Sequence, residues 1–338
     1  MIPLTSVPPR TPSAGSGALL CVRDLSVTYG GVTGIPALRH VNLEIQPGEI
    51  VGVLGESGSG KSTLALSILG LLPVNAMVQG EVAFKGENLG DADETRRRTI
   101  RGAGISMIFQ DPNLALSPVM RVGDQIVEVM RAHSEAKPKL LRKQCEEMLK
   151  KVHLSDIQRI YKAYPHQLSG GELHRIAIAQ ALCCQPDLVI ADEATRSLDA
   201  TLQNEVLDVL RAARERSGAA ILVVTHNPAL LAGFADRVVV MYAGRIVEDG
   251  PATQILSRPF HPYTKGLIEL APRALRPSPD AIRKLPVIHG YLDLAGREMR
   301  GCAFEPRCPA RTSVCQTEFP EEALPEAGRR VSCFNHAH

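Results

Sequence analysis

The sequence predicts an α/β core that carries an antiparallel β-subdomain, an inserted α-helical subdomain and a C-terminal extension containing cysteines. Three observations lead to this fold class. Several short apolar strands end in glycine, carboxylate or histidine residues, a helical pattern without strands fills about residues 111–182, and the composition changes near residue 259. The 338 residues exceed one average domain, and a hydrophobic content of 44% suffices for a packed core.

The N-terminal residues 1–18 are rich in proline, serine and glycine, which predicts a disordered tail. They lack a basic stretch followed by an apolar one, so we do not expect a signal peptide. No apolar run approaches the roughly 18 residues needed to cross a bilayer, so membrane association must use a partner. The net charge of +2 gives no argument for nucleic acid, and Arg96, Arg97, Arg98 and Arg101 are expected on a solvated helix face.

The phosphate-binding signal lies between a strand and a helix. Residues 50–54 predict a buried strand, residues 55–62 then read G-x-x-x-x-G-K-S, and an apolar helix follows through Leu72. Glycines let the backbone N–H groups turn inward around nucleotide phosphates, Lys61 adds positive charge, and the Ser62 hydroxyl suits Mg²⁺. A glycine-rich turn without a ligand is disfavoured because strand, loop and helix occur together. The predicted phosphate-binding residues are Gly55, Glu56, Ser57, Gly58, Ser59, Gly60, Lys61, Ser62 and Thr63.

Alternating apolar and polar positions over residues 19–29 and 41–45 predict strands of an antiparallel sheet, and residues 80–84 predict another. Tyr29 ends the first strand just upstream of the phosphate loop. Its ring either stacks on an adenine or packs within the strand, and composition does not separate these two roles.

Residues 105–109 predict a short strand that ends at Gln110, and residues 111–182 are then helical. Residues 141–152 place apolar side chains at helical spacing. Before the last helix stand Ser169, Gly170, Gly171 and Glu172, where free N–H groups and the helix dipole favour an anion. Taken alone, the tripeptide Ser-Gly-Gly is a weak signal, because most such tripeptides form only a turn.

Residues 188–191 form an apolar strand that ends in Asp192 and Glu193. A carboxylate for Mg²⁺ followed by one that polarises water is what hydrolysis of ATP requires, whereas a solvated strand end is the ordinary alternative. Residues 202–213 predict a helix, and the strand over 220–224 ends at Thr225 and His226. Open α/β sheets bind ligands at this edge, so we expect His226 to contact the γ-phosphate. The other nine histidines are expected to be structural.

A closing hairpin is predicted over residues 238–241 and 245–247, joined through Ala243 and Gly244. Prolines and four of the eight cysteines then mark a different composition from about residue 259. We expect this segment to be an appendage separate from the core.

Taken together, the motifs in this order resemble the ATP-binding cassette (ABC) family of transport ATPases, over residues 19 to about 257. The stretches SMIFQDPNLALSPVMRVGDQI, VMYAGRIVEDGP, HPYTKGL and GCAFEPRCP further resemble the ATPase subunits of oligopeptide/dipeptide permeases. The resemblance implies a RecA-like P-loop core, an ABC nucleotide-binding domain over 19–258 with a helical subdomain at about 111–182, and an oligopeptide-permease-type extension over 259–338.

The resemblance also implies roles for single residues. Tyr29 stacks the adenine, and Ser62, Gln110 and Asp192 organise Mg²⁺. Glu193 is the general base for the attacking water, and His226 senses the γ-phosphate. Together with Lys61, which contacts the phosphates, they are the predicted catalytic residues. The signature residues Ser169, Gly170, Gly171 and Glu172 act in trans on a second subunit, and Asp199 belongs to the D-loop that follows the carboxylates.

Some positions depart from the family pattern. Ala194 stands in place of proline, Arg196 in place of a small hydroxyl residue, and Ser197 in place of alanine. Glu172 replaces a common glutamine, and Asn227 a usual aspartate. None of these removes a catalytic group, but Arg196 is expected close to the subunit interface.

Four cysteines in the extension, Cys302, Cys308, Cys315 and Cys333, are spaced C-x5-C-x6-C-x17-C. In a cytosolic protein such a group suggests a metal centre, and the wide gaps favour an iron–sulfur cluster over zinc or uncoordinated thiols. The family resemblance points to the same [4Fe–4S] cluster. The remaining cysteines, which lie in apolar patterns and are expected in the core, are Cys21, Cys145, Cys183 and Cys184.

The sequence thus predicts a subunit that hydrolyses ATP with Mg²⁺ at the cytoplasmic face of the inner membrane. The implied partners are a second ATPase subunit, with a heterodimer expected, two membrane-spanning permeases and an extracytoplasmic solute-binding protein. The implied cargo is an oligopeptide or dipeptide. Importers of nickel, metallophores or other small solutes share these motifs, and a soluble ABC ATPase of DNA repair is the rival from another class, without the coiled coils or zinc modules such proteins carry.

Overall fold

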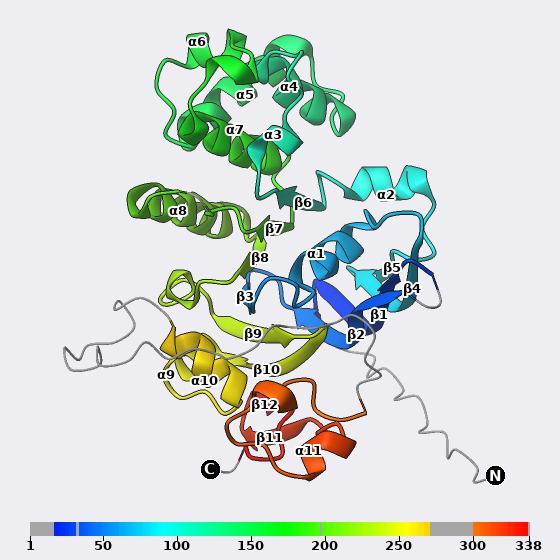
Figure 1. Ribbon diagram of the computed structural model, residues 1–338. Helices are drawn as coiled ribbons and strands as arrows, with labels where there is room; N and C mark the ends of the chain where they lie inside the picture. The colour runs from blue at the N-terminus through cyan, green and yellow to red at the C-terminus, as the bar shows by residue number, and fades with distance from the viewer. Residues whose placement is uncertain (1–16, 32–33, 197, 271–299, 337–338) are drawn as a thin grey trace.

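Two β-sheets, a helical region and a C-terminal segment make up the chain in the computed structural model, which describes residues 17–31, 34–196, 198–270 and 300–336 (Figure 1). The helical region lies at one end of the molecule, and the C-terminal segment lies at the other. Most of the tail over 1–18 falls outside the described residues. The order of elements confirms the predicted α/β class.

The smaller sheet is antiparallel and precedes most of the core in the chain. Its four strands have the order β2-β1-β4-β5. Strand β2 starts six residues earlier than predicted, because exposed and partly buried positions at its start hide the alternation on which the prediction relied. The strands are β1 Leu20–Tyr29, β2 Ile35–Ile45, β4 Ala76–Phe84 and β5 Glu87–Asn88.

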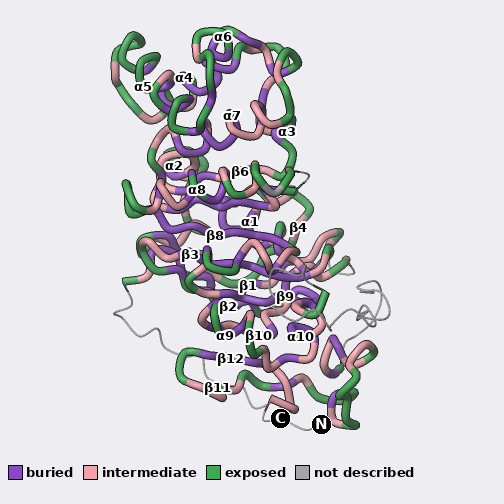
Figure 2. Tube along the Cα trace, turned by 90° about the vertical axis from the view of Figure 1, so that its left-hand side faces the viewer, coloured by how far each residue is buried: buried purple, intermediate pink, exposed green. Residues whose placement is uncertain are grey.

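The larger sheet has eight strands in the order β11-β12-β10-β9-β3-β8-β7-β6, and β9, β3, β8, β7 and β6 run parallel. Figure 2 shows its central strands as a buried layer. Along β3, Ile50 and Leu54 pack into one hydrophobic cluster while Val51 and Val53 pack into a second. Both faces are therefore covered, as expected for apolar parallel strands. The strands are β3 Ile50–Leu54, β6 Ile105–Ile108, β7 Leu188–Asp192, β8 Ala220–Thr225, β9 Arg237–Tyr242, β10 Arg245–Pro251, β11 Ala323–Glu326 and β12 Arg329–Val331.

The described residues of the inserted segment form helices joined by loops, without a strand, in agreement with the predicted helical pattern. It packs onto the core mainly through α7, which contacts β6 and α8, and α8 itself spans Ala200–Ser217. No helix among the described residues is both long enough and apolar enough to span a bilayer. The helices of the insertion are α3 Pro112–Ala115, α4 Val122–Ala132, α5 Pro138–Lys151, α6 Ile157–Lys162, the 3₁₀ turn η1 Pro165–Gln167, and α7 Gly170–Leu182.

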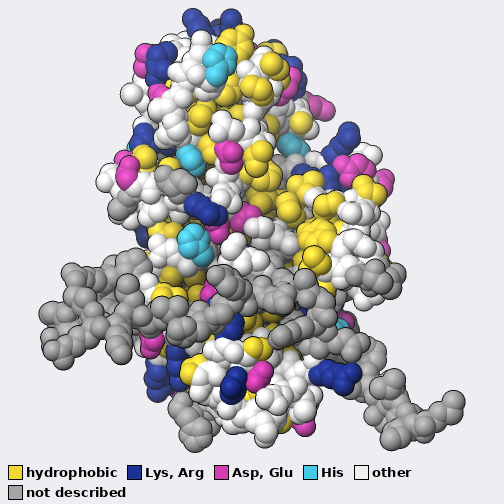
Figure 3. All heavy atoms as spheres, in the orientation of Figure 1, with side chains coloured by type: hydrophobic (Ala, Val, Ile, Leu, Met, Phe, Trp, Pro, Cys, Tyr) yellow, Lys and Arg dark blue, Asp and Glu magenta, His cyan; other side chains and the backbone are white. Residues whose placement is uncertain are grey.

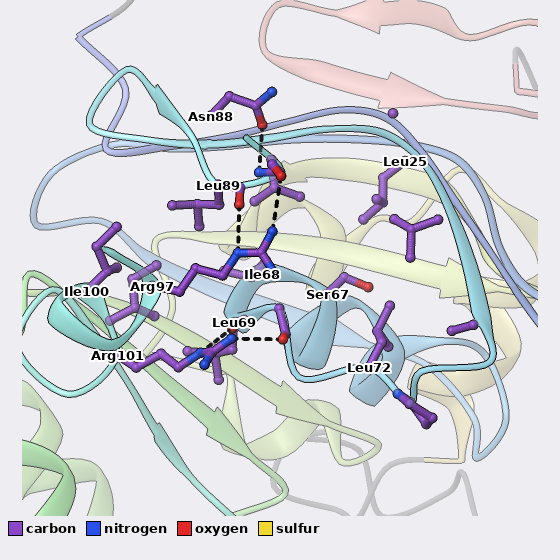
Figure 4. Close-up of a pocket in the computed structure, with 18 residues that line it drawn as sticks. Leu25, Ser67, Ile68, Leu69, Leu72, Asn88, Leu89, Arg97, Ile100 and Arg101 are labelled. Carbon is purple, nitrogen blue, oxygen red and sulfur yellow. Dashed lines mark hydrogen bonds between the residues drawn. The ribbon is translucent and has the colours of Figure 1, made fainter. Parts of the chain in front are cut away.

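Helix α1 (Lys61–Leu69) is anchored at its C-terminal end by Arg101, the residue that follows α2 (Glu94–Ile100). Arg101 donates to the carbonyl oxygens of Leu69 and Gly70 at 2.8 and 2.9 Å, and Arg97 donates to that of Leu89 at 3.1 Å (Figure 4). Arg101 thereby satisfies carbonyls that the end of α1 leaves unpaired, whereas Arg97 bonds to the chain just after β5. The expected solvated face is therefore wrong for Arg97 and Arg101, which border a cavity of about 420 Å³ beside α1.

The C-terminal segment continues the larger sheet, because β12 pairs with β10 through Glu248 and Val331. It was expected to be separate from the core. Arg329 is fully buried, donates to Glu248 at 3.0 Å and lies 3.8 Å from the centre of the Phe260 ring. The elements around this joint are α9 Ala252–Ser257, α10 Pro262–Glu269, the 3₁₀ turn η5 Glu305–Arg307 and α11 Val314–Thr317.

His261 caps the start of α10 next to the same joint. Its own N–H donates to Glu248 at 3.0 Å, and its Nδ1 accepts from the N–H of Tyr263 at 3.0 Å. Burial lowers the pKa of His261 to about 3. The imidazole is therefore neutral in the folded protein at ordinary pH.

Replacing Arg329 with Ala should destabilise the protein by roughly 3 to 5 kcal/mol, because Glu248 would stay buried without its cationic partner. The matched control is the neighbouring Arg330, whose 3.9 Å pair with Glu322 is exposed. Its replacement should cost under about 1 kcal/mol. Urea unfolding of both variants tests this, and equal midpoints would contradict a structural role for the buried pair.

His261→Asn should reduce the loss of stability in mild acid. In the unfolded chain His261 binds a proton as the pH falls below 6.5, whereas in the folded protein its imidazole stays neutral down to about pH 3. The free energy of unfolding therefore decreases as the pH falls from 6.5 towards 3. Between pH 7 and 5 the His261 contribution is about 2 kcal/mol, which the variant should lack. Asparagine keeps an acceptor for the N–H of Tyr263. Urea titrations at both pH values measure the difference, with exposed His166→Asn as control, and identical pH slopes for parent and His261→Asn would refute it.

Candidate functional site

The loop between β3 and α1 has the backbone shape that its glycines predict. Gly58 and Gly60 adopt φ angles of 82° and 104°, in the left-handed region that favours glycine. A Cβ atom at Gly55 would lie 2.4 Å from the carbonyl oxygen of Met241, and one at Gly60 would lie 2.7 Å from that of Ala37. The glycines are therefore required both by conformation and by close packing.

Lys61 begins α1 and turns back into this loop. Its Nζ donates to the carbonyl oxygens of Gly55 and Glu56 at 2.9 and 2.8 Å, and only 4% of the residue is exposed. Burial lowers the pKa of Lys61, and the nearby carboxylates of Glu193 and Asp192 oppose that shift. The loop thus surrounds an amine at the N-terminal end of a helix, where anions are favoured.

Asp192 ends β7 beside Ser62. Burial raises the pKa of Asp192, and a hydrogen bond from Ser62 opposes the shift. The Oδ1 atom of Asp192 is buried and has no hydrogen-bond partner among the described residues. A hydroxyl beside an unpartnered carboxylate oxygen is an oxygen donor set that suits Mg²⁺. Gln110 lies exposed beyond the end of β6, and within the described residues no hydrogen bond joins it to Ser62 or Asp192.

Glu193 and His226 meet at the same edge of the sheet. The Nδ1 of His226 lies 3.3 Å from one carboxylate oxygen of Glu193, and Arg196 donates to the other at 3.1 Å. Glu193 has a φ of 46°, which is strained for a side chain with a Cβ atom. With Glu56 these three residues line a cavity of about 440 Å³. The predicted base and the predicted phosphate-contacting histidine are therefore adjacent.

Tyr29 lies at the end of β1 next to the start of α1. Its hydroxyl donates to the Oγ1 of Thr63 at 3.3 Å, and its half-buried ring packs against the cluster of the smaller sheet. Strand packing is therefore observed, while stacking on an adenine stays a prediction.

The signature residues form the N-terminal cap of α7. The Ser169 hydroxyl accepts from the N–H of Glu172 at 3.3 Å, and the N–H of Ser169 donates to the Glu172 carboxylate at 2.8 Å. This bond and the ion pair with Arg159 lower the pKa of Glu172. Asp199 likewise caps α8 by accepting from the N–H of Leu202 at 3.0 Å. None of these residues lines the cavity beside Glu193.

Sequence reasoning missed two residues that contact the phosphate loop. The Tyr263 hydroxyl accepts from the N–H of Glu56 at 2.7 Å, and Arg307 binds the Glu56 carboxylate. They lie 207 and 251 residues away along the chain. The motifs HPYTKGL and GCAFEPRCP drew attention to both segments, but no local pattern indicates where they dock.

The four cysteines of the C-terminal segment lie near one another. The N–H of Cys302 donates to the carbonyl oxygen of Cys315 at 2.8 Å. The pKa of Cys302 is raised to about 11, first by burial and further by the thiols of the other three. In the described part of the chain, however, no group of three or more His, Cys, Asp or Glu residues has a geometry that could hold a metal ion. The predicted iron–sulfur cluster is therefore not supported by this geometry. Of the other four cysteines, Cys21 and Cys145 are buried, as expected, whereas Cys183 and Cys184 are partly exposed.

Comparison with known proteins agrees with these motifs. Residues 38–196 match the family described as ABC transporter, and residues 247–315 match the oligopeptide/dipeptide transporter C-terminal region. The chain is 41% identical to the probable peptide ABC transporter ATP-binding protein y4tR of Sinorhizobium fredii and 38% identical to the oligopeptide transport ATP-binding protein OppD of Salmonella typhimurium. Each match covers 94% of both chains.

Among solved structures, the chain resembles a dimeric post-hydrolysis state of the ATP-binding cassette MJ0796 bound to ADP and Pi. The TM-score is 0.62 and the identity 30%, over 69% of this chain and 98% of that one. The phosphate loop and the paired carboxylates lie within residues 38–196, which match the ABC transporter family. The chain therefore belongs to the ABC transporter family and is an ABC-type ATPase.

Proposed function

We propose that this chain is the ATP-hydrolysing subunit of a bacterial importer for oligopeptides or dipeptides. One observation carries the proposal: the phosphate loop, Asp192, Glu193 and His226 converge at one sheet edge of a chain whose full-length relatives are named peptide transport ATP-binding proteins. We divide the chain functionally at about residue 258, with the nucleotide site before it and the permease-type extension after it.

The side chains suggest how the reaction proceeds. The loop N–H groups and Lys61 bind the β- and γ-phosphates, and Tyr29 contacts the adenine ring of the nucleotide. Glu193 accepts a proton from water as the water oxygen bonds to the γ-phosphorus. The bond to the bridging oxygen breaks, and that oxygen leaves with its electron pair on ADP. His226, 3.3 Å from Glu193, contacts the γ-phosphate.

Ser62 and Asp192, with Gln110 as a further proposed ligand, would hold a magnesium ion, which would supply positive charge to the phosphate oxygens. The unpartnered Oδ1 of Asp192 supports this assignment. That oxygen is buried and forms no hydrogen bond within the described residues, so its lost hydration is not offset by the protein. A bound cation would offset it.

We further propose that a second ATPase subunit completes the site. The signature residues cap α7 and are not among the residues that line their own chain's cavity. A Cβ at Gly170 would meet no atom within 4 Å, so this helix start is accessible. A head-to-tail dimer brings it to the partner's nucleotide, with Asp199 near the contact. The cassette that resembles this chain is itself described as dimeric. We expect two different subunits.

The membrane partners are proposed to be two permeases, fed by an extracytoplasmic solute-binding protein, with this chain on the cytoplasmic face. Hydrophobic side chains are exposed between the helical region and the core (Figure 3). A groove of about 280 Å³ lies there, lined by α1, β6, α3 and α7. Leu71 and Leu114 at this groove are 42% and 79% exposed. Because this groove lies between the helical region and the core, a permease segment bound in it would be displaced when the helical region moves relative to the core.

For the cysteines we propose a [4Fe–4S] cluster, with zinc or free thiols as alternatives. Three backbone N–H groups, those of Phe304, Ala310 and Asn335, are directed at the sulfurs of Cys302, Cys308 and Cys333. Hydrogen bonds to sulfur are a common means of tuning iron–sulfur sites. The sequence spacing of the four cysteines, C-x5-C-x6-C-x17-C, is wider than the C-x2-4-C pairs usual for a single structural zinc. The cluster would serve either as a structural staple or in redox regulation.

Two other functions remain alternatives to peptide import. The same architecture could move nickel, a metallophore or another small solute, since cargo selection lies in the partners. A soluble ATPase of DNA repair is disfavoured by the match to the transporter C-terminal region.

The test of the proposed function combines binding, turnover and uptake. Glu193→Gln should bind ATP as the parent does but lose turnover by about a hundredfold or more, because no base takes the proton. Lys61→Ala should lose binding itself. In vesicles with the cognate permeases and binding protein, a labelled tripeptide should enter only with the parent subunit. Peptide uptake at full rate with Glu193→Gln would contradict the mechanism, and uptake of another solute alone would favour the second function.

Anaerobically purified protein should contain iron and acid-labile sulfide, and Cys308→Ser should lose both because one of four ligands is removed. Cys183→Ser, outside the group, is the matched control and should keep them. Metal analysis and the visible absorption spectrum are the readouts. Stoichiometric zinc, or protein without either element, would exclude the cluster.

A further inference from the structure

A salt bridge joins the cysteine-bearing segment to the phosphate loop. Arg307 lies in the short turn between Cys302 and Cys308, and its side chain is only 6% exposed. Its two terminal nitrogens donate to the two carboxylate oxygens of Glu56 at 2.7 and 3.0 Å. Two parallel charge-assisted bonds of this kind fix the direction of both groups.

Aromatic side chains hold the guanidinium in place. It lies 5.8 Å from the ring centre of Tyr242 and 6.0 Å from that of Phe304, and it donates to the Tyr242 hydroxyl at 3.4 Å. The ion pair with Glu56 raises the pKa of Arg307. Arg307 therefore presents a fixed positive charge to the loop.

Glu56 is held at each of its polar groups. Its N–H donates to the Tyr263 hydroxyl, its carbonyl oxygen accepts from Lys61 at 2.8 Å, and its carboxylate is bound by Arg307. Glu56 also lines the cavity that contains Glu193 and His226. A bare carboxylate there would repel a triphosphate, and Coulomb repulsion is strong where the surroundings exclude water.

We propose that Arg307 is a positioning residue for the phosphate loop, neutralising and orienting Glu56 so that the loop accepts a triphosphate. The inference rests on the proposed nucleotide site. It extends that site into the C-terminal segment, which thereby contributes to nucleotide affinity as well as to folding.

Arg307 is not what holds the C-terminal segment on the core. That segment is also attached by the pairing of β12 with β10 and by the buried pair of Arg329 with Glu248. Exchange of Arg307 for methionine retains the hydrophobic stem against Tyr242 and Phe304. The effect on the loop can therefore be measured in folded protein.

The experiment measures binding of a fluorescent ATP analogue and steady-state ATPase kinetics on the full chain. Arg307→Met should raise the Kd about tenfold, the size of a coupling between neighbouring charges. KM should rise more than kcat falls. Adding Glu56→Gln to Arg307→Met removes the uncompensated carboxylate and should recover most of the affinity. Arg311→Ala is the matched control, because that arginine is exposed in the same segment and should leave the Kd unchanged.

Two outcomes overturn the proposal: an unchanged Kd for Arg307→Met, or a double variant that binds as weakly as the single one. If thermal unfolding shows that Arg307→Met does not fold, Arg307→Lys replaces it. Lysine keeps the positive charge without the two-pronged guanidinium group, so the Kd of Arg307→Lys should rise less than about threefold. A larger rise in Kd would reject the idea that Arg307 acts by neutralising Glu56. Lys61→Ala distinguishes failure of the proposed nucleotide site from failure of the role proposed for Arg307. Normal ATP binding by Lys61→Ala would reject the nucleotide site itself. Normal binding by Arg307→Met alone would reject only the role of Arg307.

Discussion

The parallel register of β3, β8 and β7 is the constraint on which the site depends. Leu54 pairs with Thr225, and Asp192 pairs with Val224, so the three strands end within one residue of each other. The residues that follow, the phosphate loop, His226 and Glu193, must then emerge side by side. A slip of one residue would turn the side chains of a strand to the opposite face and separate these groups. The apolar side chains of β3 pack into two separate clusters, so such a slip would also exchange the members of one cluster for those of the other.

Local patterns were sufficient for most of this site, and contacts distant in sequence explain the rest. The phosphate loop, Asp192, Glu193 and His226 each follow a short buried strand, and strand ends can be recognised from residues a few positions apart. The start of β2 was not predicted, since pairing with β1 stabilises residues whose own alternation is weak. Tyr263 and Arg307 act on Glu56 across more than 200 residues. Their positions depend on how the C-terminal segment docks, which no spacing within a motif determines.

The C-terminal segment shows how a chain with little apolar sequence is held to a core. Its contact is built from buried charge and aromatic rings: Arg329 pairs with Glu248, and Tyr242, Tyr263 and Phe304 pack with ring centres 4.6 to 5.4 Å apart. A buried ion pair gives little net stability but penalises any arrangement that separates the two charges. The joint therefore specifies one docking position, and that position delivers Arg307 to the phosphate loop.

The departures from the family pattern follow the same rule, because each added charge is paired nearby. Glu172 in place of glutamine completes the cap of α7 with Ser169 and pairs with Arg159, so the N-terminal geometry of the helix is retained. Arg196 pairs with Glu193, and the Arg196 side chain is 51% exposed whereas that of Glu193 is 12% exposed. Pairs of this kind contribute at most about 1 kcal/mol. A contact that weak does not hold Glu193 away from water, and the proposed base stays available at the sheet edge.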